Sequence, residues 1–268
     1  SKFGVKKLLP AYLDPNLQLE DLLTGVSFAS GGTGCDPLTS KLASVISLSD
    51  QLNMFKEYKN KINEAVGENR MEMIISKSVY IICIGSNDIA NTYAPYRSIN
   101  YDIQSYTDLL ASYFSNFLQE LYGLGARRIG VIGVPYIGCV PSQRTLGGGR
   151  ERACSDIENQ AAKLFNSKLV FLMDAFEIKF PDTKLVYIDS YHPLMYMVQN
   201  PAKYGFDVAD RGCCGTGDLE VGIFCNHYSS SICSNSSRYI FWDSFHPTQE
   251  AYNLLSSMVL DDKIKDFF

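Results

Sequence analysis

The chain has 268 residues, of which 46% are hydrophobic, and this is enough apolar material for the core of one α/β domain. Its formal net charge of -5 argues against a nucleic-acid-binding protein, because such proteins normally carry a basic patch. No apolar run reaches the length of a membrane span, so we expect no transmembrane segment. We predict a single domain over residues 1–268 that is a monomer.

The first quarter of the chain predicts one strand and two helices. Residues 1–23 are polar and interrupted by prolines, so they are expected to be irregular. Gly25–Ala29 has the pattern of a short strand that leads into the glycine-rich turn 30–34, where glycine allows positive φ and close approach of a ligand. Ser47 is a favourable N-cap for a helix over residues 48–66, and a second helix is predicted over residues 68–76.

A continuous apolar run over residues 79–84 predicts a strand that is buried on both faces of a parallel sheet. The run ends in Gly85-Ser86-Asn87-Asp88. Ligands bind at the carboxyl ends of strands in open α/β sheets, so the side-chain amide of Asn87 is a candidate oxyanion donor. Taken alone, the tetrapeptide is more simply explained as an Asn-Asp turn.

Strands continue to alternate with helices along the rest of the chain, and this pattern predicts a parallel sheet with helices on both faces. Apolar residues at three-four spacing predict helices, and one of these begins at a capping box formed by Ser155 and Glu158. The predicted elements are helices over residues 106–121, 155–180 and 193–204 and strands over residues 128–134, 185–189 and 239–241.

An aspartate precedes one of the chain's three histidines by three residues in Asp243-Ser244-Phe245-His246-Pro247. On a turn that leads into a helix, Asp243 can bind Nδ1–H of His246 and leave Nε2 free to act as a general base. Pro247 is expected at the first position of that helix. An isolated pair of this kind is more often a surface pair at a helix start, so the upstream motifs decide its meaning.

The other two histidines, His192 and His227, are interpreted as structural because neither is judged to have an acid at a useful spacing. No metal site is expected, because the acidic clusters lack ligand spacing. No cofactor is expected either.

The cysteines favour disulfides over a zinc site, because adjacent cysteines with wide later spacings do not fit Cys-x-x-Cys pairs. Cys83 is expected to be a buried thiol, and Cys35 has no evident partner. Disulfides and the glycosylation sequon at Asn235 predict a secreted glycoprotein. A signal peptide is therefore expected upstream of Ser1, and the printed sequence contains none.

Three ordered segments resemble blocks two, three and five of the GDSL esterases/lipases of the SGNH-hydrolase superfamily, and most closely the plant extracellular-lipase branch. They are Gly-Val-Ser-Phe-Ala-Ser-Gly-Gly-Thr-Gly (25–34), Ile-Gly-Ser-Asn-Asp (84–88) and Trp-Asp-Ser-Phe-His-Pro-Thr (242–248). The resemblance covers nearly the whole chain, including residues 134–139 and 213–217. An α/β domain that carries these motifs by chance is the weakest alternative.

The resemblance implies a flavodoxin-like three-layer α/β/α sandwich that hydrolyses carboxylic esters through an acyl-serine intermediate. It makes His246 the general base and Asp243 its orienting acid. The oxyanion donors are Asn87 and the backbone N–H of Gly34, with Gly32 as the second choice. The family acts on lipid, acetylated polysaccharide and small phenolic esters. We expect Cys139 to pair with Cys154, and Cys213 and Cys214 to pair with Cys225 and Cys233 in either order.

Block one, the Gly-Asp-Ser segment that supplies the nucleophile, is absent from the 268 residues. None of Ser27, Ser30, Ser86 and Ser244 occupies a strand-to-helix turn that would replace it. We therefore expect a hydrolase domain that lacks its first strand at the N-terminus and does not turn over esters by itself. The competing hypothesis is a non-catalytic secreted relative that binds lipid or glycan.

Overall fold

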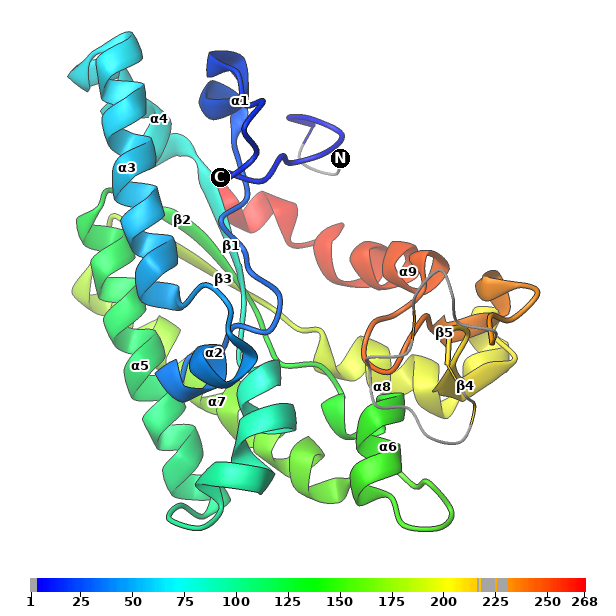
Figure 1. Ribbon diagram of the computed structural model, residues 1–268. Coiled ribbons are helices and arrows are strands. Elements are labelled where there is room, and N and C mark those ends of the chain that lie inside the picture. The colour runs from blue at the N-terminus through cyan, green and yellow to red at the C-terminus, as the bar shows by residue number, and fades with distance from the viewer. Residues whose placement is uncertain (1–3, 216, 218–224, 226–230) are drawn as a thin grey trace. The chain divides into compact units, whose positions relative to one another are not determined.

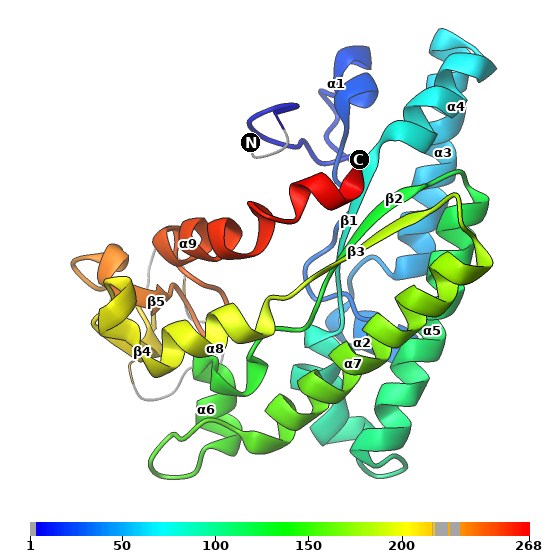
Figure 2. The same cartoon turned by 180° about the vertical axis from the view of Figure 1, so that it is seen from behind.

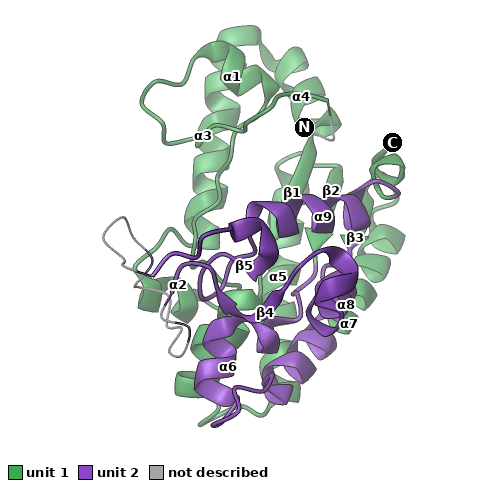
Figure 3. Cartoon of the chain, turned by 90° about the vertical axis from the view of Figure 1, so that its right-hand side faces the viewer, with its two compact units in different colours: residues 1–132, 167–187, 263–268 green, residues 133–166, 188–262 purple. Residues whose placement is uncertain are grey.

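The computed structural model describes residues 4–215, 217, 225 and 231–268 (Figure 1, and from behind in Figure 2). It forms two compact units (Figure 3). Unit 1 contains residues 1–132, 167–187 and 263–268, and unit 2 contains residues 133–166 and 188–262.

Helices and strands alternate along much of the described chain, as the sequence predicts. The strands are β1 (Val79–Cys83), β2 (Arg128–Ile132), β3 (Lys184–Ile188), β4 (Val208–Gly212) and β5 (Tyr239–Phe241). The α-helices are α1 (Leu19–Thr24), α2 (Pro37–Ala43), α3 (Leu48–Val66), α4 (Glu68–Lys77), α5 (Ile103–Gly123), α6 (Pro141–Gly147), α7 (Asp156–Lys179), α8 (Tyr191–Gln199) and α9 (Gln249–Leu260). A π-helix, η1 (Asp88–Arg97), follows β1, and short 3-10 turns are η2 (Ile137–Cys139), η3 (Pro201–Tyr204), η4 (Ser236–Arg238) and η5 (Ile264–Phe267).

The predicted helix starts at Ser47 and Ser155 are confirmed. The Ser47 hydroxyl accepts a hydrogen bond from Asp50 N at 3.2 Å, and Asp50 completes the capping box of α3. The Ser155 hydroxyl donates to Glu158 just before α7 begins. These local signals are sufficient because a cap needs only residues within one turn.

The main sheet has the strand order β1-β2-β3, and β1 pairs with β2 in parallel. Side chains alternate between the two faces, so Ile82 and its partner Val131 share a face with Tyr80 and Ile129. This face is packed against α3, where the Tyr80 ring lies 5.5 Å from the ring of Phe55. The α/β class and the parallel sheet are therefore confirmed.

The prediction that residues 79–84 are buried on both faces is wrong. Ile81 is 45% exposed and Cys83 is an exposed free thiol, so Cys83 is also not the buried thiol that was expected. The cover that unit 1 supplies on this face is η5, whose Phe267 ring lies over Gly130 beside Ile81. An apolar run shows that a strand is suited to burial, but it does not specify what covers each face.

The strand predicted over Gly25–Ala29 is also not formed. Only an isolated parallel bridge joins Ala11 to Ser27, with Ser27 N donating to Pro10 O at 2.8 Å. Phe28 instead enters an aromatic cluster, with its ring 5.0 Å from that of Tyr12 and 5.7 Å from that of Phe55. The apolar residues of this segment are thus used for packing rather than for a sheet ladder.

Unit 2 contains a second sheet, in which β4 and β5 pair in parallel. β4 was not predicted, because its sequence Val-Ala-Asp-Arg-Gly lacks an apolar run.

The predicted disulfides are present as Cys139–Cys154, Cys213–Cys233 and Cys214–Cys225, which also gives the order that the sequence left open. None of the described helices combines the length and apolar character that crossing a bilayer requires.

Phe267 provides a test of the cover on the sheet in unit 1. The side chain is 0% exposed, and a Cβ built on Gly130 would lie 2.7 Å from its ring. We expect Phe267→Ala to lower the free energy of unfolding by about 3 kcal/mol, because the substitution leaves a cavity against β2. Urea unfolding followed by circular dichroism measures this change.

The neighbouring Phe268 is a matched control because it is 72% exposed. Phe268→Ala should change the free energy of unfolding by less than about 1 kcal/mol. Equal effects of the two substitutions would contradict the role of Phe267 as cover for the sheet.

Candidate active site

Asn87 lies in unit 1 at the point where β1 gives way to η1. Gly85 has φ +105°, a conformation that favours glycine, and this turns the chain directly after the strand. The Asn87 side chain accepts a hydrogen bond from Asn91 Nδ2 at Oδ1 (3.2 Å), and its own Nδ2 donates to Thr33 O at 3.0 Å. The amide group of Asn87 is therefore directed with its donor side toward the glycine-rich turn.

Gly34 lies in that same turn and is buried. Among the described residues, none accepts a hydrogen bond from its backbone N–H. Buried N–H groups are nearly always paired, so an unpaired one is a candidate donor to a ligand. Gly32 is less buried and has φ +88°, so Gly34 is the better candidate of the two glycines for the oxyanion donor.

Asp243 and His246 form a hydrogen-bonded pair in unit 2. His246 Nδ1 lies 2.9 Å from Asp243 Oδ2, and the backbone N–H groups of Phe245 and His246 donate to Asp243 Oδ1 at 2.8 and 2.7 Å. The carboxylate thus orients the imidazole while backbone groups hold the carboxylate. This is the geometry predicted from the Asp-x-x-His spacing.

The electrostatics of the pair follow from these contacts. The hydrogen bond to Asp243 raises the pKa of His246 above its usual value. Burial would raise the pKa of Asp243, but its hydrogen bonds with His246 and the backbone N–H groups hold that pKa below its usual value. At neutral pH Asp243 is therefore ionised, and it stabilises a proton on the imidazole.

The turn that bears this pair is held by its neighbours in unit 2. Trp242 N donates to His246 O at 2.7 Å, and Cys214 N donates to Trp242 O at 2.7 Å, which joins the turn to the disulfide-bonded segment.

The expected position of Pro247 is wrong by two residues, because Thr248 is the N-cap of α9 and Pro247 precedes it. The Thr248 hydroxyl accepts from Ala251 N, so the capping function belongs to threonine.

The four predicted site residues are therefore present as two pairs. Asn87 and Gly34 belong to unit 1, and Asp243 and His246 belong to unit 2 (Figure 3). His227 lies outside the described residues. Within the described part of the chain, no cluster of His, Cys, Asp and Glu is suited to hold a metal ion.

The interpretation of His192 as lacking an acid partner is wrong. Its Nδ1 lies 2.6 Å from Asp189 Oδ2, and Asp189 Oδ1 accepts from the backbone N–H groups of Tyr191 and His192. The sequence contained the signal, because Asp-Ser-Tyr-His-Pro (189–193) repeats the pattern of Asp-Ser-Phe-His-Pro (243–247). Two such turns in one chain show that the Asp-x-x-His geometry alone does not identify a catalytic base.

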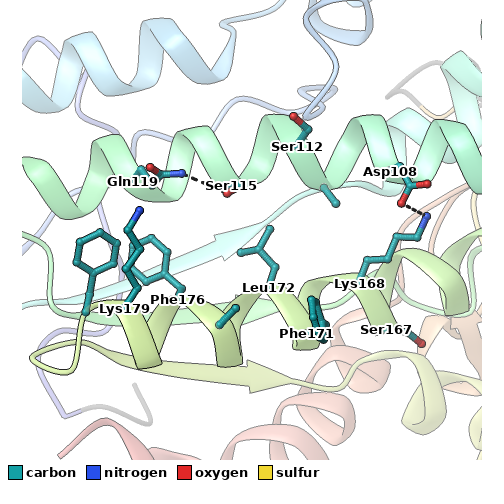
Figure 4. A pocket seen from close by; sticks show the side chains of 13 residues that line it. Asp108, Ser112, Ser115, Gln119, Ser167, Lys168, Phe171, Leu172, Phe176 and Lys179 are labelled. Carbon is teal, nitrogen blue, oxygen red and sulfur yellow. Dashed lines mark hydrogen bonds and ion pairs between the residues drawn. The ribbon is translucent and has the colours of Figure 1, made fainter.

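A groove of about 580 Å³ lies elsewhere in unit 1, between α5 and α7 (Figure 4). Its walls are apolar at Phe171, Leu172 and Phe176, and an ion pair between Lys168 and Asp108 lies at one end. None of the four predicted site residues lines this groove. It contains neither a histidine nor a cysteine, so it offers no imidazole base and no thiol nucleophile for ester chemistry.

Comparisons with known proteins agree with the motifs. Residues 1–259 match the family of GDSL-like lipases/acylhydrolases. The chain is 52% identical to the GDSL esterase/lipase EXL3 of Arabidopsis thaliana over 267 residues, which are 99% of this chain and 73% of that relative. It is 45% identical to the GDSL esterase/lipase EXL2 of the same plant over 271 residues, covering 96% of this chain and 72% of the relative. The chain belongs to the GDSL-like lipase/acylhydrolase family.

Proposed function

We propose that this chain supplies the general base and the oxyanion donors of a carboxylic ester hydrolase. The observation that carries the proposal is the Asp243–His246 hydrogen bond in a chain of the GDSL family. The oriented imidazole is the group that activates a serine hydroxyl, and family membership distinguishes this pair from an ordinary helix-start pair.

The chemistry has two half-reactions. His246 Nε2 takes the proton of a serine hydroxyl as its oxygen attacks the ester carbonyl, and the carbonyl oxygen becomes an oxyanion. Asn87 Nδ2 and Gly34 N donate hydrogen bonds to that oxyanion. The intermediate collapses to an acyl-serine as His246 gives its proton to the leaving alcohol. In the second half-reaction water attacks the acyl-serine, and His246 takes its proton and then returns it to the serine oxygen as the carboxylic acid is released.

The natural substrate class is a small-molecule, lipid or polysaccharide ester, and lipid degradation is one role that fits it. The disulfides of unit 2 support a secreted protein, because such bonds persist in oxidising compartments. The sequon at Asn235 supports a glycoprotein, since this residue is exposed.

A second candidate function is that of a relative that binds a lipid or glycan ester, and the positions of the described serines favour it. The serines near the candidate site have structural positions: Ser30 Oγ accepts from Ile46 N, and Ser244 is 4% exposed with its carbonyl bonded to Ser142 N. A relative that keeps the oxyanion donors without a nucleophile would bind a lipid or glycan ester and not cleave it.

The role of Asp243 is tested by titration of the imidazoles. The chain has only three histidines, so NMR resolves His246 readily, and we expect Asp243→Asn to lower the pKa of His246. In the folded chain the raised pKa means that the pair contributes stability below pH 6.5, and this contribution is lost as pH rises through the folded-state pKa. General-base activity has the opposite trend, because it requires the neutral imidazole and increases through the same pKa.

Asp189→Asn is the matched control, since Asp189 holds His192 in the same type of turn. This substitution should leave the titration of His246 unchanged. An unaltered His246 titration in Asp243→Asn would show that the carboxylate does not act on the imidazole.

Hydrolysis of p-nitrophenyl butyrate tests the catalytic proposal. The 268-residue chain should show no turnover above buffer, and a version extended by the family's Gly-Asp-Ser block should hydrolyse the ester. In the extended version, His246→Ala should lower kcat by roughly 10⁴-fold or more. Asn87→Ala should lower kcat by roughly 10²-fold to 10³-fold with little change in KM, because it removes an interaction made in the transition state.

His192→Ala provides the control, because His192 has the same Asp-x-x-His geometry and no proposed role in the reaction. Its kcat should equal that of the unsubstituted protein. Turnover by the 268-residue chain that depends on His246 would contradict the missing-nucleophile part of the proposal. An extended version that binds the ester without cleaving it would favour the second candidate function.

A further inference from the structure

Asp88, which follows Asn87 directly, is a fully buried carboxylate with 0% exposure. It accepts hydrogen bonds from Cys35 N at 2.8 Å, from Asp36 N at 3.0 Å and from Thr39 Oγ1 at 2.7 Å. These donors belong to the segment just after Gly34 and to the first turn of α2. Asp88 therefore joins the end of β1 to the glycine-rich turn, which is about fifty residues distant in sequence.

The carboxylate is packed directly against Gly34. A Cβ built on Gly34 would overlap the Oδ1 atom of Asp88 and would also lie 2.7 Å from Cβ of Thr39. Only glycine allows the turn to approach this closely. The position of the Gly34 N–H therefore depends on the carboxylate beside it.

A second layer of contacts holds the donors themselves. Thr92 Oγ1 lies 2.8 Å from Thr39 Oγ1, and Arg97 binds Asp36 through two hydrogen bonds of 2.7 and 2.8 Å. Asp88, Thr92 and Arg97 all lie on the π-helix η1, so one element supplies the groups that fix the turn. π-Helical segments are often found at functional sites.

We propose that Asp88 is a positioning residue, whose carboxylate holds residues 33–36 so that the Gly34 N–H and the Asn87 amide remain side by side as oxyanion donors. Asp88 does not touch the reacting atoms and acts through Gly34 and Asn87. The inference rests on the proposed function for its catalytic meaning, whereas the hydrogen bonds exist independently of it.

The charge of Asp88 adds a pH dependence to this arrangement. Burial raises the pKa of Asp88 to about 6, with the hydrogen bonds from Thr39, Cys35 and Asp36 opposing this and the nearby Asp36 carboxylate adding to it. The Cys35 thiol and Tyr106 on α5 also face Asp88, and the pKa values of both are raised. Arg97 on η1 binds the neighbouring Asp36 carboxylate, which raises the pKa of Arg97. Proton uptake near pH 6 removes the negative charge that the donors of the turn bind, so the hydrogen bonds that hold the turn become weaker.

The sign of this titration determines which measurement is informative. An acid with a raised folded-state pKa is unfavourably ionised in the fold, so the folded chain takes up a proton between about pH 3.8 and 6 that the unfolded chain does not. Asp88→Asn removes the buried charge and is expected to remain folded while it loses an acceptor for the turn. Local measurements on residues 33–36 are therefore required, rather than the global stability.

Cys35 is a reporter for the turn, because its free thiol is buried and its amide is bound by Asp88. The exposed free thiol of Cys83 is replaced in the background by Cys83→Ser. We expect Asp88→Asn to increase the rate of Cys35 modification by 4,4′-dithiodipyridine at pH 7 at least tenfold. Thr39→Val, which removes one of the three hydrogen bonds, should give a smaller increase and serves if Asp88→Asn does not fold.

Asp102→Asn is the matched control, because Asp102 caps α5 through Ser105 N and does not contact the turn. Its Cys35 rate should remain within twofold of the background. Hydrogen exchange adds a pH test: the protection of the Cys35 and Asp36 amides should fall between pH 7 and pH 5 in the background and remain flat in Asp88→Asn. An unchanged Cys35 rate in Asp88→Asn, or an equal increase in Asp102→Asn, would overturn the proposal.

The catalytic consequence is measured separately in the version extended by Gly-Asp-Ser. Asp88→Asn should lower kcat by at least tenfold with little change in KM, because the donors are no longer aligned for the transition state. A loosened turn with unchanged kcat would overturn the positioning role. If the extended version with Asp88 intact hydrolyses no ester, the proposed function fails. The exchange and thiol measurements still decide whether Asp88 holds the turn.

Discussion

A carboxylate that accepts hydrogen bonds from two successive backbone N–H groups organises each of the two pairs of candidate site residues. Asp88 accepts from Cys35 N and Asp36 N, and Asp243 accepts from Phe245 N and His246 N. A buried or half-buried carboxylate needs donors for its lone pairs, and adjacent backbone N–H groups in a turn supply them at a fixed spacing. The requirement to satisfy each carboxylate therefore fixes the backbone of the segment that bears Gly34 in one case and His246 in the other.

The two carboxylates differ in the distance over which they act, and this decides what the sequence reveals. Asp243 binds groups two and three residues ahead, so the spacing of Asp243 and His246 was sufficient to predict their hydrogen bond. Asp88 binds residues that precede it by about fifty positions, and no local pattern marks that contact. The sequence showed Asn87 and the glycine-rich turn as separate candidates. Their connection through Asp88 required the structure.

The same distinction explains the outcome for the fold. The capped helices at Ser47 and Ser155 and the strands of the main sheet depend on local propensity and were predicted well. Ile81 is exposed, and Gly25–Ala29 does not form the predicted strand. Both outcomes depend on which segments pack beside these residues, and the apolar composition of a segment does not encode its neighbours. Phe28 could serve either a ladder or an aromatic cluster, and the rings of Tyr12 and Phe55 determined which.

The two Asp-Ser-aromatic-His-Pro turns show that a local motif predicts a hydrogen-bonded turn but does not by itself predict a catalytic role. Both place Nδ1 of the histidine on the carboxylate three residues before it, so the motif encodes the same hydrogen-bonded turn in each case, at the start of α8 for His192 and just before the N-cap of α9 for His246. The surroundings of the two turns differ, because the Asp243 side chain is 18% exposed and that of Asp189 is 41% exposed. The backbone of His246 is also bonded to Trp242, which the disulfide-bonded segment holds in turn. A general base must keep one orientation through a reaction, so a deeper carboxylate and an anchored turn support the role proposed for His246 rather than one for His192.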